Sequence, residues 1–309
     1  MIHASDRVHA VATRMSERRP RLAAGRNGSS ARVHSCFRSA LNIATPDGLL
    51  TVASEALGVL PNGIVADLGP DFRALGIRVG MAVEGNAVRL SIPDVGFRLD
   101  IAGATTWCPR ILPSGDGAIR TAARWRQRSA ATRALALERA VDGGLAGLLE
   151  TSRARGRPRS LDVTEFARPI LRALAGALAD GDRPAAARWA HGLIGLGPGL
   201  TPSGDDVLVG VEAALHALGR PSAGFLGRAV DDVDARTTTV AATFLRHAAR
   251  GEFAERLHVL LVALLARDDA AIPDALQRAV AWGATSGTDC LVGVLCGLDV
   301  ATAHDRWLA

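Results

Sequence analysis

Between residue 33 and about residue 110, apolar and polar residues alternate in short runs that are separated by Pro, Gly, Asn and Asp. Runs of this length and period predict β-strands, because successive side chains of a strand point to opposite faces. The stretch AVEGNAVRL (82–90) places Glu84, Gly85 and Asn86 where a hairpin turn is expected. Strands so closely spaced predict a small antiparallel β-rich domain, a barrel or a sandwich, over residues 33–118.

After Pro113 the apolar residues follow the period of a helix. In the second half of this region the pattern predicts helices over residues 204–218, 235–249, 253–266, 273–282 and 287–298. The chain is therefore predicted to have an α+β fold, in which an all-α domain over 119–309 follows the β-rich domain.

The first 32 residues have a different composition from the rest. They hold seven arginines against two acidic residues, and they show no apolar periodicity. A nucleic-acid-binding arm and a transit-like peptide are both compatible with this charge, but basic segments without aromatic residues carry no specific signal. We therefore predict a disordered basic tail over 1–32 and no nucleic-acid partner.

Composition excludes several kinds of chemistry. The chain has no lysine, so a phosphate-binding loop with its lysine, a Schiff base and a lysine general base are all impossible. Four cysteines without CxxC spacing indicate a reduced, cytoplasmic setting. The apolar run at 259–266 is too short to span a bilayer, so no membrane association is expected.

One sequence motif occurs twice. SGDDVLVGV (203–211) and SGTDCLVGV (286–294) are identical at seven of nine positions, which indicates an internal repeat. The first copy follows the glycine- and proline-rich stretch GLGPGLTP (195–202). Each copy stands at the head of an apolar run, and Gly210 and Gly293 would allow the two predicted helices to cross closely.

The serines and aspartates of the motif have a structural interpretation. Ser203 with Asp206, and Ser286 with Asp289, fit the spacing of a capping box, in which each side chain accepts a hydrogen bond at the start of its own helix. Capping does not explain Gly204 and Gly287, because glycine costs about 1 kcal/mol relative to alanine inside a helix. Glycine at a helix start would let an anion approach the free N–H groups there.

With both copies considered, the sequence resembles a bacterial family first catalogued as a domain of unknown function. That family is now associated with the H-type subunit of oxamate carbamoyltransferase, from anaerobic allantoin breakdown, a branch of purine catabolism. The resemblance rests on GLGPGLTPSGDDVLVG (195–210) and SGTDCLVGVLCGL (286–298), with weaker support from HSCFRSALNIATPDGLLTV (34–52) and ATTWCP (104–109).

The resemblance implies conversion of oxalurate and phosphate to oxamate and carbamoyl phosphate, in a hetero-oligomer with other subunits. Helix-start N–H groups and arginines suit such anions, and neither a metal nor a cofactor is expected. Asp205, Ser203 and Asp289 are the predicted catalytic residues, with Asp205 orienting the carbamoyl NH₂ group. The predicted substrate-binding residues are Gly197, Gly199, Thr201, Gly204, Asp206, Ser286 and Gly287.

Two alternatives remain open. The chain could be a Mg²⁺-dependent helical hydrolase that uses Asp205, Asp206 and Asp289 as oxygen ligands. It could also be a non-catalytic scaffold subunit that binds partner chains through the β-rich domain. On the anion-binding hypothesis, Gly204→Val is expected to abolish ligand binding while the protein stays folded.

Overall fold

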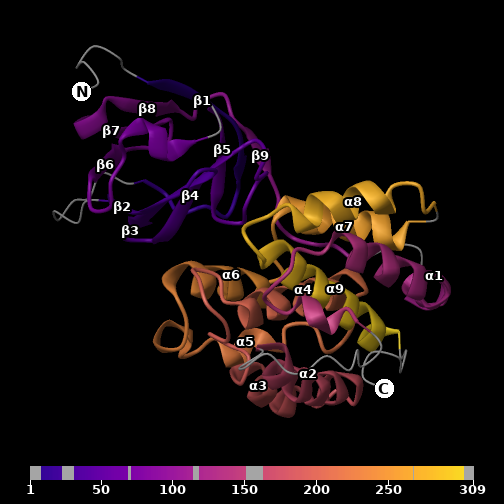
Figure 1. Ribbon diagram of the computed structural model, residues 1–309. Helices are drawn as coiled ribbons and strands as arrows, with labels where there is room; N and C mark the ends of the chain where they lie inside the picture. Colours follow the sequence, from indigo (N-terminus) through magenta and orange to yellow (C-terminus); the bar gives the residue numbers. More distant parts are fainter. Residues whose placement is uncertain are drawn as a thin grey trace. The chain divides into compact units, whose positions relative to one another are not determined.

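The computed structural model describes residues 8–22, 31–68, 71–113, 118–150, 163–266 and 268–302. The chain divides into two compact units, Met1–Pro109 and Arg110–Ala309. The first unit is built of strands and the second of helices (Figure 1), so the predicted α+β class is confirmed. The division falls after Pro109, whereas the sequence pattern placed it at residue 118.

The first unit contains nine strands in its described part. They are β1 (His9–Ser16), β2 (Ala31–Cys36), β3 (Ala40–Thr45), β4 (Gly48–Ser54), β5 (Gly63–Asp67), β6 (Ala82–Gly85), β7 (Arg89–Ile92), β8 (Phe97–Asp100) and β9 (Thr105–Trp107). The sheet order is β5-β4-β3-β2-β6-β7-β8-β1-β9, and an additional β1–β5 pairing closes strands β1–β8 into a barrel. The expected hairpin joins β6 to β7, where the Asn86 side chain accepts hydrogen bonds from the N–H groups of Val88 and Arg89.

The sheet is mixed rather than purely antiparallel. β4 pairs parallel with β5, and β1 pairs parallel with both β8 and β9. Alternate residues of the strands fill the barrel, as in β8, where Phe97 and Leu99 are buried and Arg98 and Asp100 are exposed. This alternation is the pattern that predicted the strands.

Strand β1 corrects the prediction of a disordered tail over residues 1–32. Val11–Met15 pair with β5, and His9–Val11 pair with β8, so this strand closes the barrel. Its inward-facing residues include Ala10 and Ala12, which are too small and too weakly apolar to produce a recognisable strand pattern. Residues 1–7 and 23–30 of the predicted tail lie outside the described residues.

The second unit is helical throughout its described part. Its helices are α1 (Ala118–Arg139), α2 (Val163–Ala179), α3 (Arg183–His191), α4 (Ser203–Ala217), α5 (Leu226–Ala229), α6 (Thr239–Ala249), α7 (Glu255–Leu265), α8 (Ile272–Val280) and α9 (Ser286–Ala301). The five helices predicted in the second half of this region correspond to α4, α6, α7, α8 and α9. None of the described helices combines the length and the apolar character needed to cross a membrane.

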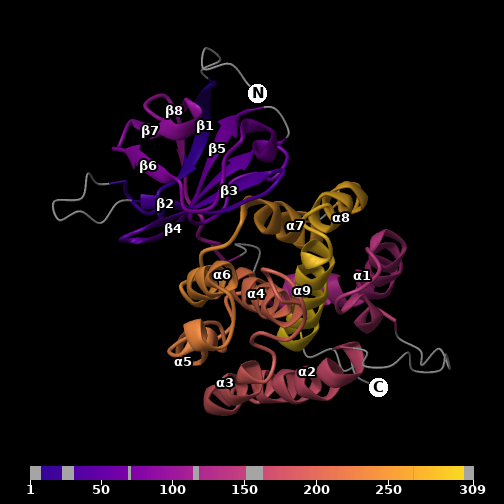
Figure 2. The ribbon, with the colours of Figure 1, turned by 60° about the vertical axis from the view of Figure 1, so that its left-hand side comes forward.

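Helices α4 and α9 form the centre of this unit (Figure 2). They run in the same direction and touch backbone to backbone. A Cβ atom on Gly210 would lie 2.1 Å from the carbonyl oxygen of Cys290, and one on Gly293 would lie 2.0 Å from that of Val207. Val207 and Cys290 occupy equivalent positions in the two motif copies, so the copies pack with approximate two-fold symmetry. This confirms that the motif glycines allow a close crossing.

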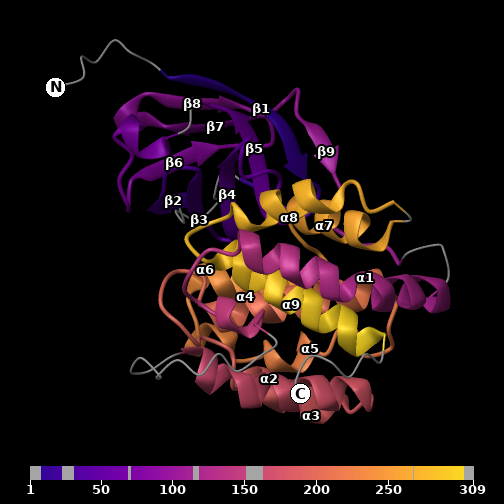
Figure 3. The same ribbon diagram turned by 45° about the vertical axis from the view of Figure 1, so that its right-hand side comes forward.

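Helix α1 packs against α9 (Figure 3) through a buried polar contact. The indole N–H of Trp125 donates to Asp299 Oδ1 at 2.7 Å, and the Arg133 guanidinium pairs with Asp299 Oδ2. Trp125 is completely buried and Asp299 nearly so. A buried carboxylate with both oxygens paired fixes the position of α1 on α9.

Replacing Gly210 should destabilise the helical unit, because a Cβ cannot fit against the Cys290 backbone. We expect Gly210→Ala to lower the free energy of unfolding by about 3 kcal/mol, measured by urea denaturation followed by circular dichroism. The matched control is Gly176→Ala in α2, where an added Cβ meets no atom within 4 Å. That change should raise stability by about 0.5–1 kcal/mol through helix propensity. Equal effects of the two substitutions would contradict the close crossing.

Candidate functional site

The two motif copies bring their serines and aspartates together at the adjacent starts of α4 and α9. The serine of each copy interacts with the aspartate of the other: Ser203 with Asp289, and Ser286 with Asp206. The helices are capped differently from the prediction. Pro202 is the N-cap of α4 and Thr285 that of α9, and neither helix has a side-chain capping hydrogen bond. The capping-box interpretation is therefore wrong, because the crossing places each serine beside the opposite helix.

Gly204 and Gly287 do not offer free N–H groups. The N–H of Gly204 donates to the Leu196 carbonyl and that of Gly287 to the Trp282 carbonyl, both at 2.9 Å. A Cβ on Gly204 would lie 2.0 Å from the Leu193 oxygen, and one on Gly287 would lie 2.2 Å from the Ala279 oxygen. Close backbone packing explains both glycines. It replaces the expectation that Gly204→Val would leave the protein folded.

The carboxyl groups of Asp206 and Asp289 are the most unusual feature of the site. Both residues are buried, at 3% and 0% exposure, and the Oδ2 atom of each lacks a hydrogen-bond partner among the described residues. Burial and the charge of Asp289 raise the pKa of Asp206 well above its ordinary value, although the Ser286 and Thr201 hydroxyls oppose the rise. Burial likewise raises the pKa of Asp289, which accepts a hydrogen bond from the Leu145 N–H at 2.6 Å.

Two buried carboxyl groups that repel each other when ionised favour a protonated state. The pair is therefore a place where a proton can be held away from solvent. The positive ends of the two helix dipoles are occupied by these side chains.

Asp205 has a structural position. Its Oδ1 accepts from the Gly195 N–H at 3.0 Å and its Oδ2 from the Thr237 hydroxyl at 2.5 Å. Burial raises its pKa to about 6, against these two hydrogen bonds. Asp205, predicted to orient the carbamoyl NH₂ group, thus has both carboxylate oxygens engaged within the protein. In the part of the chain that the structure describes, no three His, Cys, Asp or Glu side chains are arranged to hold a metal ion.

The glycine-rich stretch 195–202 forms a surface loop before α4. The Thr238 hydroxyl donates to the Leu200 carbonyl, and the Thr201 hydroxyl lies 2.7 Å from that of Ser286. Gly197 and Gly199 have φ angles of 109° and 100°, which side-chain-bearing residues rarely adopt. Gly199 is exposed and a Cβ there would meet nothing within 4 Å, so its backbone is open to a ligand. Thr201 is half-buried and connects this surface to the buried aspartates.

Two further groups complete the site, and the motif alone did not indicate them. The turn before residues 146–148 covers Asp289, and a Cβ on Gly144 would lie 2.5 Å from Asp289 Oδ1. Arg256 of α7 stacks over Trp282 with its guanidinium carbon 5.5 Å from the ring centre. Burial lowers the pKa of Arg256. Burial and the charges of Asp206 and Asp289 raise the pKa of Cys290 in α9 well above its ordinary value, and the charge of Arg256 opposes this rise. No pattern in the sequence predicts that the GGL stretch at 143–145 contacts Asp289 of the second motif copy.

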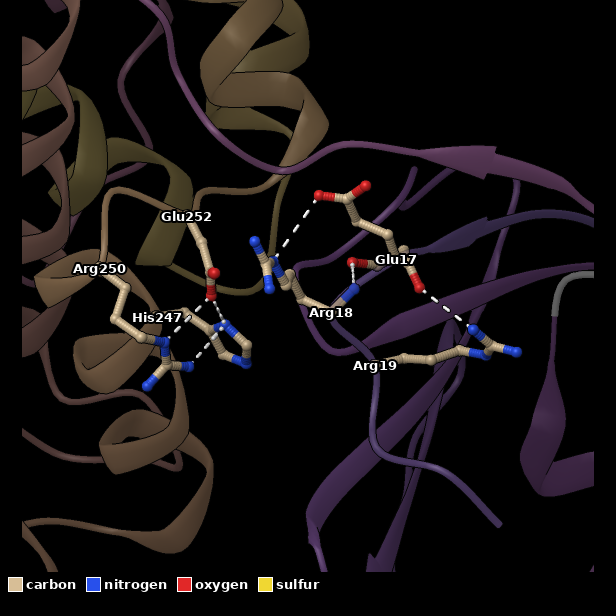
Figure 4. Close-up of polar contacts among 7 residues, drawn as sticks. Glu17, Arg18, Arg19, His247, Arg250 and Glu252 are labelled. Carbon is tan, nitrogen blue, oxygen red and sulfur yellow. Dashed lines mark hydrogen bonds and ion pairs between the residues drawn. The ribbon is translucent and has the colours of Figure 1, made fainter. Parts of the chain in front are cut away.

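A separate polar cluster lies at the end of α6 (Figure 4). His247 Nδ1 is 2.7 Å from Glu252 Oε2, and the Arg250 guanidinium contacts both side chains. Burial lowers the pKa of His247. Glu252 also forms a backbone bridge with Arg110. The cluster thus ties the 250–252 loop to the segment that precedes α1, which is a structural role.

Two protein-family models match the chain, one within each of the two units. A family model described as "Oxamate carbamoyltransferase subunit AllH" matches residues 193–298, which contain both motif copies. A second, described as "AllH family N-terminal domain", matches residues 7–106 and includes strand β1. No solved structure matches the chain.

The pKa of Asp205 predicts how stability changes with pH. A carboxyl group whose folded pKa lies above its unfolded value of 3.8 binds its proton more tightly in the folded state. Its contribution is present below about pH 4 and is lost as the pH rises through about 6, a change of up to about 3 kcal/mol. Urea unfolding between about pH 4.5 and pH 7.5 should therefore show a smaller loss of stability in Asp205→Asn than in the unmodified chain.

Asp180→Asn, at an exposed position after α2, is the control for the loss of one negative charge. It should leave the pH dependence as it is in the unmodified chain. An unchanged slope in Asp205→Asn would show that Asp205 does not titrate in this range.

Proposed function

The chain belongs to the AllH family of oxamate carbamoyltransferase subunits, and from that premise we propose that it takes part in the conversion of oxalurate and phosphate to oxamate and carbamoyl phosphate. It would act in the cytoplasm as one subunit of a hetero-oligomer. Its contribution would be the site formed by the 195–202 loop and the first turns of α4 and α9.

The reaction requires that a proton be moved. A phosphate oxygen forms a bond to the ureido carbonyl carbon, and the bond from that carbon to the oxamate nitrogen breaks. Hydrogen phosphate loses its proton and the leaving nitrogen gains one, so no net acid is consumed. A group that can accept and return a proton beside the reacting atoms lowers the barrier of such a step.

The single observation that supports this role is the connection between the surface and the buried carboxyl pair. The Thr201 hydroxyl, at the surface, lies 2.7 Å from the Ser286 hydroxyl. The Ser286 hydroxyl interacts in turn with Asp206. Thr201 and Ser286 would pass a proton between substrate and Asp206, and Asp289 would keep the pair protonated. Thr201 would be the residue that touches the substrate.

The anionic substrates need positive partners near this loop. Arg256 is held over Trp282, and its charge acts on Cys290 of α9. Arg256 would bind the oxalurate carboxylate. The backbone of the half-buried Gly197 and of the exposed Gly199 would contribute N–H donors. Gly204 and Gly287 would act indirectly by letting the surrounding backbone pack closely.

The test uses the complex purified with its partner subunits and measures carbamoyl phosphate formed from oxalurate and phosphate. Thr201→Val keeps the shape of the side chain and removes its hydroxyl. We expect kcat to fall about 100-fold while the melting temperature stays within about 2 °C of the unmodified complex. The matched control is Thr243→Val in α6, a half-buried threonine whose hydroxyl donates to the Thr239 carbonyl. It should keep the unmodified rate.

Two results would count against this proposal. An unmodified complex that forms no carbamoyl phosphate would refute the reaction. Full activity in Thr201→Val, with a complex that fails to assemble when this chain is left out, would instead support a non-catalytic scaffold subunit.

A further inference from the structure

The barrel unit contains a cavity of about 470 Å³ that the proposed reaction does not use. It lies at the end of the barrel where the β6–β7 turn is found, and its lining comes entirely from the first unit. Four groups of residues surround it: the segment after β1, the inner faces of β4 and β5, the β6–β7 turn, and the residue that follows β8. A volume of this size accommodates a small organic molecule.

The segment after β1 forms one wall of the cavity. Leu22 is buried against the β6–β7 hairpin, since a Cβ on Gly85 would lie 3.0 Å from its Cδ1 atom. Pro20 lies near the β3–β4 turn, 3.9 Å from a Cβ placed on Gly48. The wall is therefore held by apolar contacts at two points. Arg21 lies between Pro20 and Leu22, and Arg19 directly precedes Pro20. Both arginines line the cavity.

The two arginines leave this wall with excess positive charge. Arg19 is half-buried, and the hydrogen bond from its guanidinium to the Ser16 carbonyl is long, at 3.4 Å. Burial and the charge of Arg21 both lower the pKa of Arg19. Glu17 also lines the cavity, but its side chain is 3.7 Å from the exposed Arg18. Two guanidinium groups held together in this way are stabilised by a bound anion.

The accessible apolar surface of the cavity is small. It comes from the half-buried Pro20 and from Ala87 of the β6–β7 turn, which is exposed. Leu50, Ile64 and Ile101 lie behind this surface in the barrel core, at 0%, 1% and 2% exposure. The cavity thus combines two guanidinium groups with a small apolar surface, an arrangement that suits a ligand with one charged end and one apolar end.

We propose that this end of the barrel binds a small organic anion, with the anionic oxygens on Arg19 and Arg21 and an apolar or planar body against Pro20 and Ala87. The site is distinct from the 195–202 loop, and it needs neither of the buried aspartates. An amphiphilic anion fits it better than an inorganic one, because inorganic phosphate would leave the apolar surface of Pro20 and Ala87 uncovered.

Isothermal titration calorimetry of the full chain with phenyl phosphate tests the site, with inorganic phosphate and benzamide as the purely anionic and purely apolar comparisons. We expect a Kd on the order of 1 mM or tighter for phenyl phosphate, and binding at least about fivefold weaker for either comparison compound. The double variant Arg19→Gln/Arg21→Gln should weaken phenyl phosphate at least about tenfold.

The matched control is Arg89→Gln/Arg98→Gln, which removes two exposed arginines of the barrel that do not line the cavity. It should bind phenyl phosphate as the unmodified chain does, and so should Thr201→Val. Equal weakening in the two arginine double variants would reduce the effect to general electrostatic attraction and overturn the proposal. Unchanged binding in Arg19→Gln/Arg21→Gln, absent binding in the unmodified chain, or equal affinity for inorganic phosphate would also overturn it.

Discussion

The direct contact between the backbones of α4 and α9 is the constraint on which the helical unit depends. At Gly210 and Gly293 the backbone of the opposite helix occupies the space that a side chain would need. A Cβ atom added to either glycine would lie about 2 Å from a carbonyl oxygen of the other helix. Contact at this distance brings many backbone atoms into van der Waals range, and each pair contributes little on its own. The two helices run in parallel, so both N-termini lie at the same end of the pair.

Parallel packing has an electrostatic consequence. The positive ends of two helix dipoles meet at the residues of the repeated motif, and the protein supplies its own carboxyl groups there. Each aspartate interacts with the serine of the opposite copy, and one buried oxygen of each has no hydrogen-bond partner in the part of the chain that the structure describes. Burial of an unpaired carboxylate is costly, so protonation is the less costly state. The repeat thereby places two carboxyl groups with raised pKa values close to the 195–202 loop.

Much of the fold could be predicted from the sequence because the relevant signals are local. Alternation predicted the barrel strands, the helical period predicted α4 and α6–α9, and the repeat predicted that α4 and α9 would cross at their glycines. Strand β1 was missed because alanine at its inward positions gives almost no hydrophobic signal, and its pairing with β5 and β8 depends on strands far along the chain. The turn at Gly144 was missed for the same reason, since its contact with Asp289 spans more than a hundred residues.

The sequence by itself indicated which residues would come together at the starts of α4 and α9: the two Ser-Gly-x-Asp copies and the loop before the first. The absence of lysine excluded any chemistry that depends on lysine. Only the tertiary structure decided what those residues do. Spacing within one helix suggested that Ser203 would cap its own helix and that Gly204 would expose its N–H. In the folded chain Ser203 reaches Asp289, and Gly204 donates to Leu196. The reason is that a hydrogen bond forms with whichever suitable group lies within about 3 Å. The group nearest in space need not be the nearest in sequence.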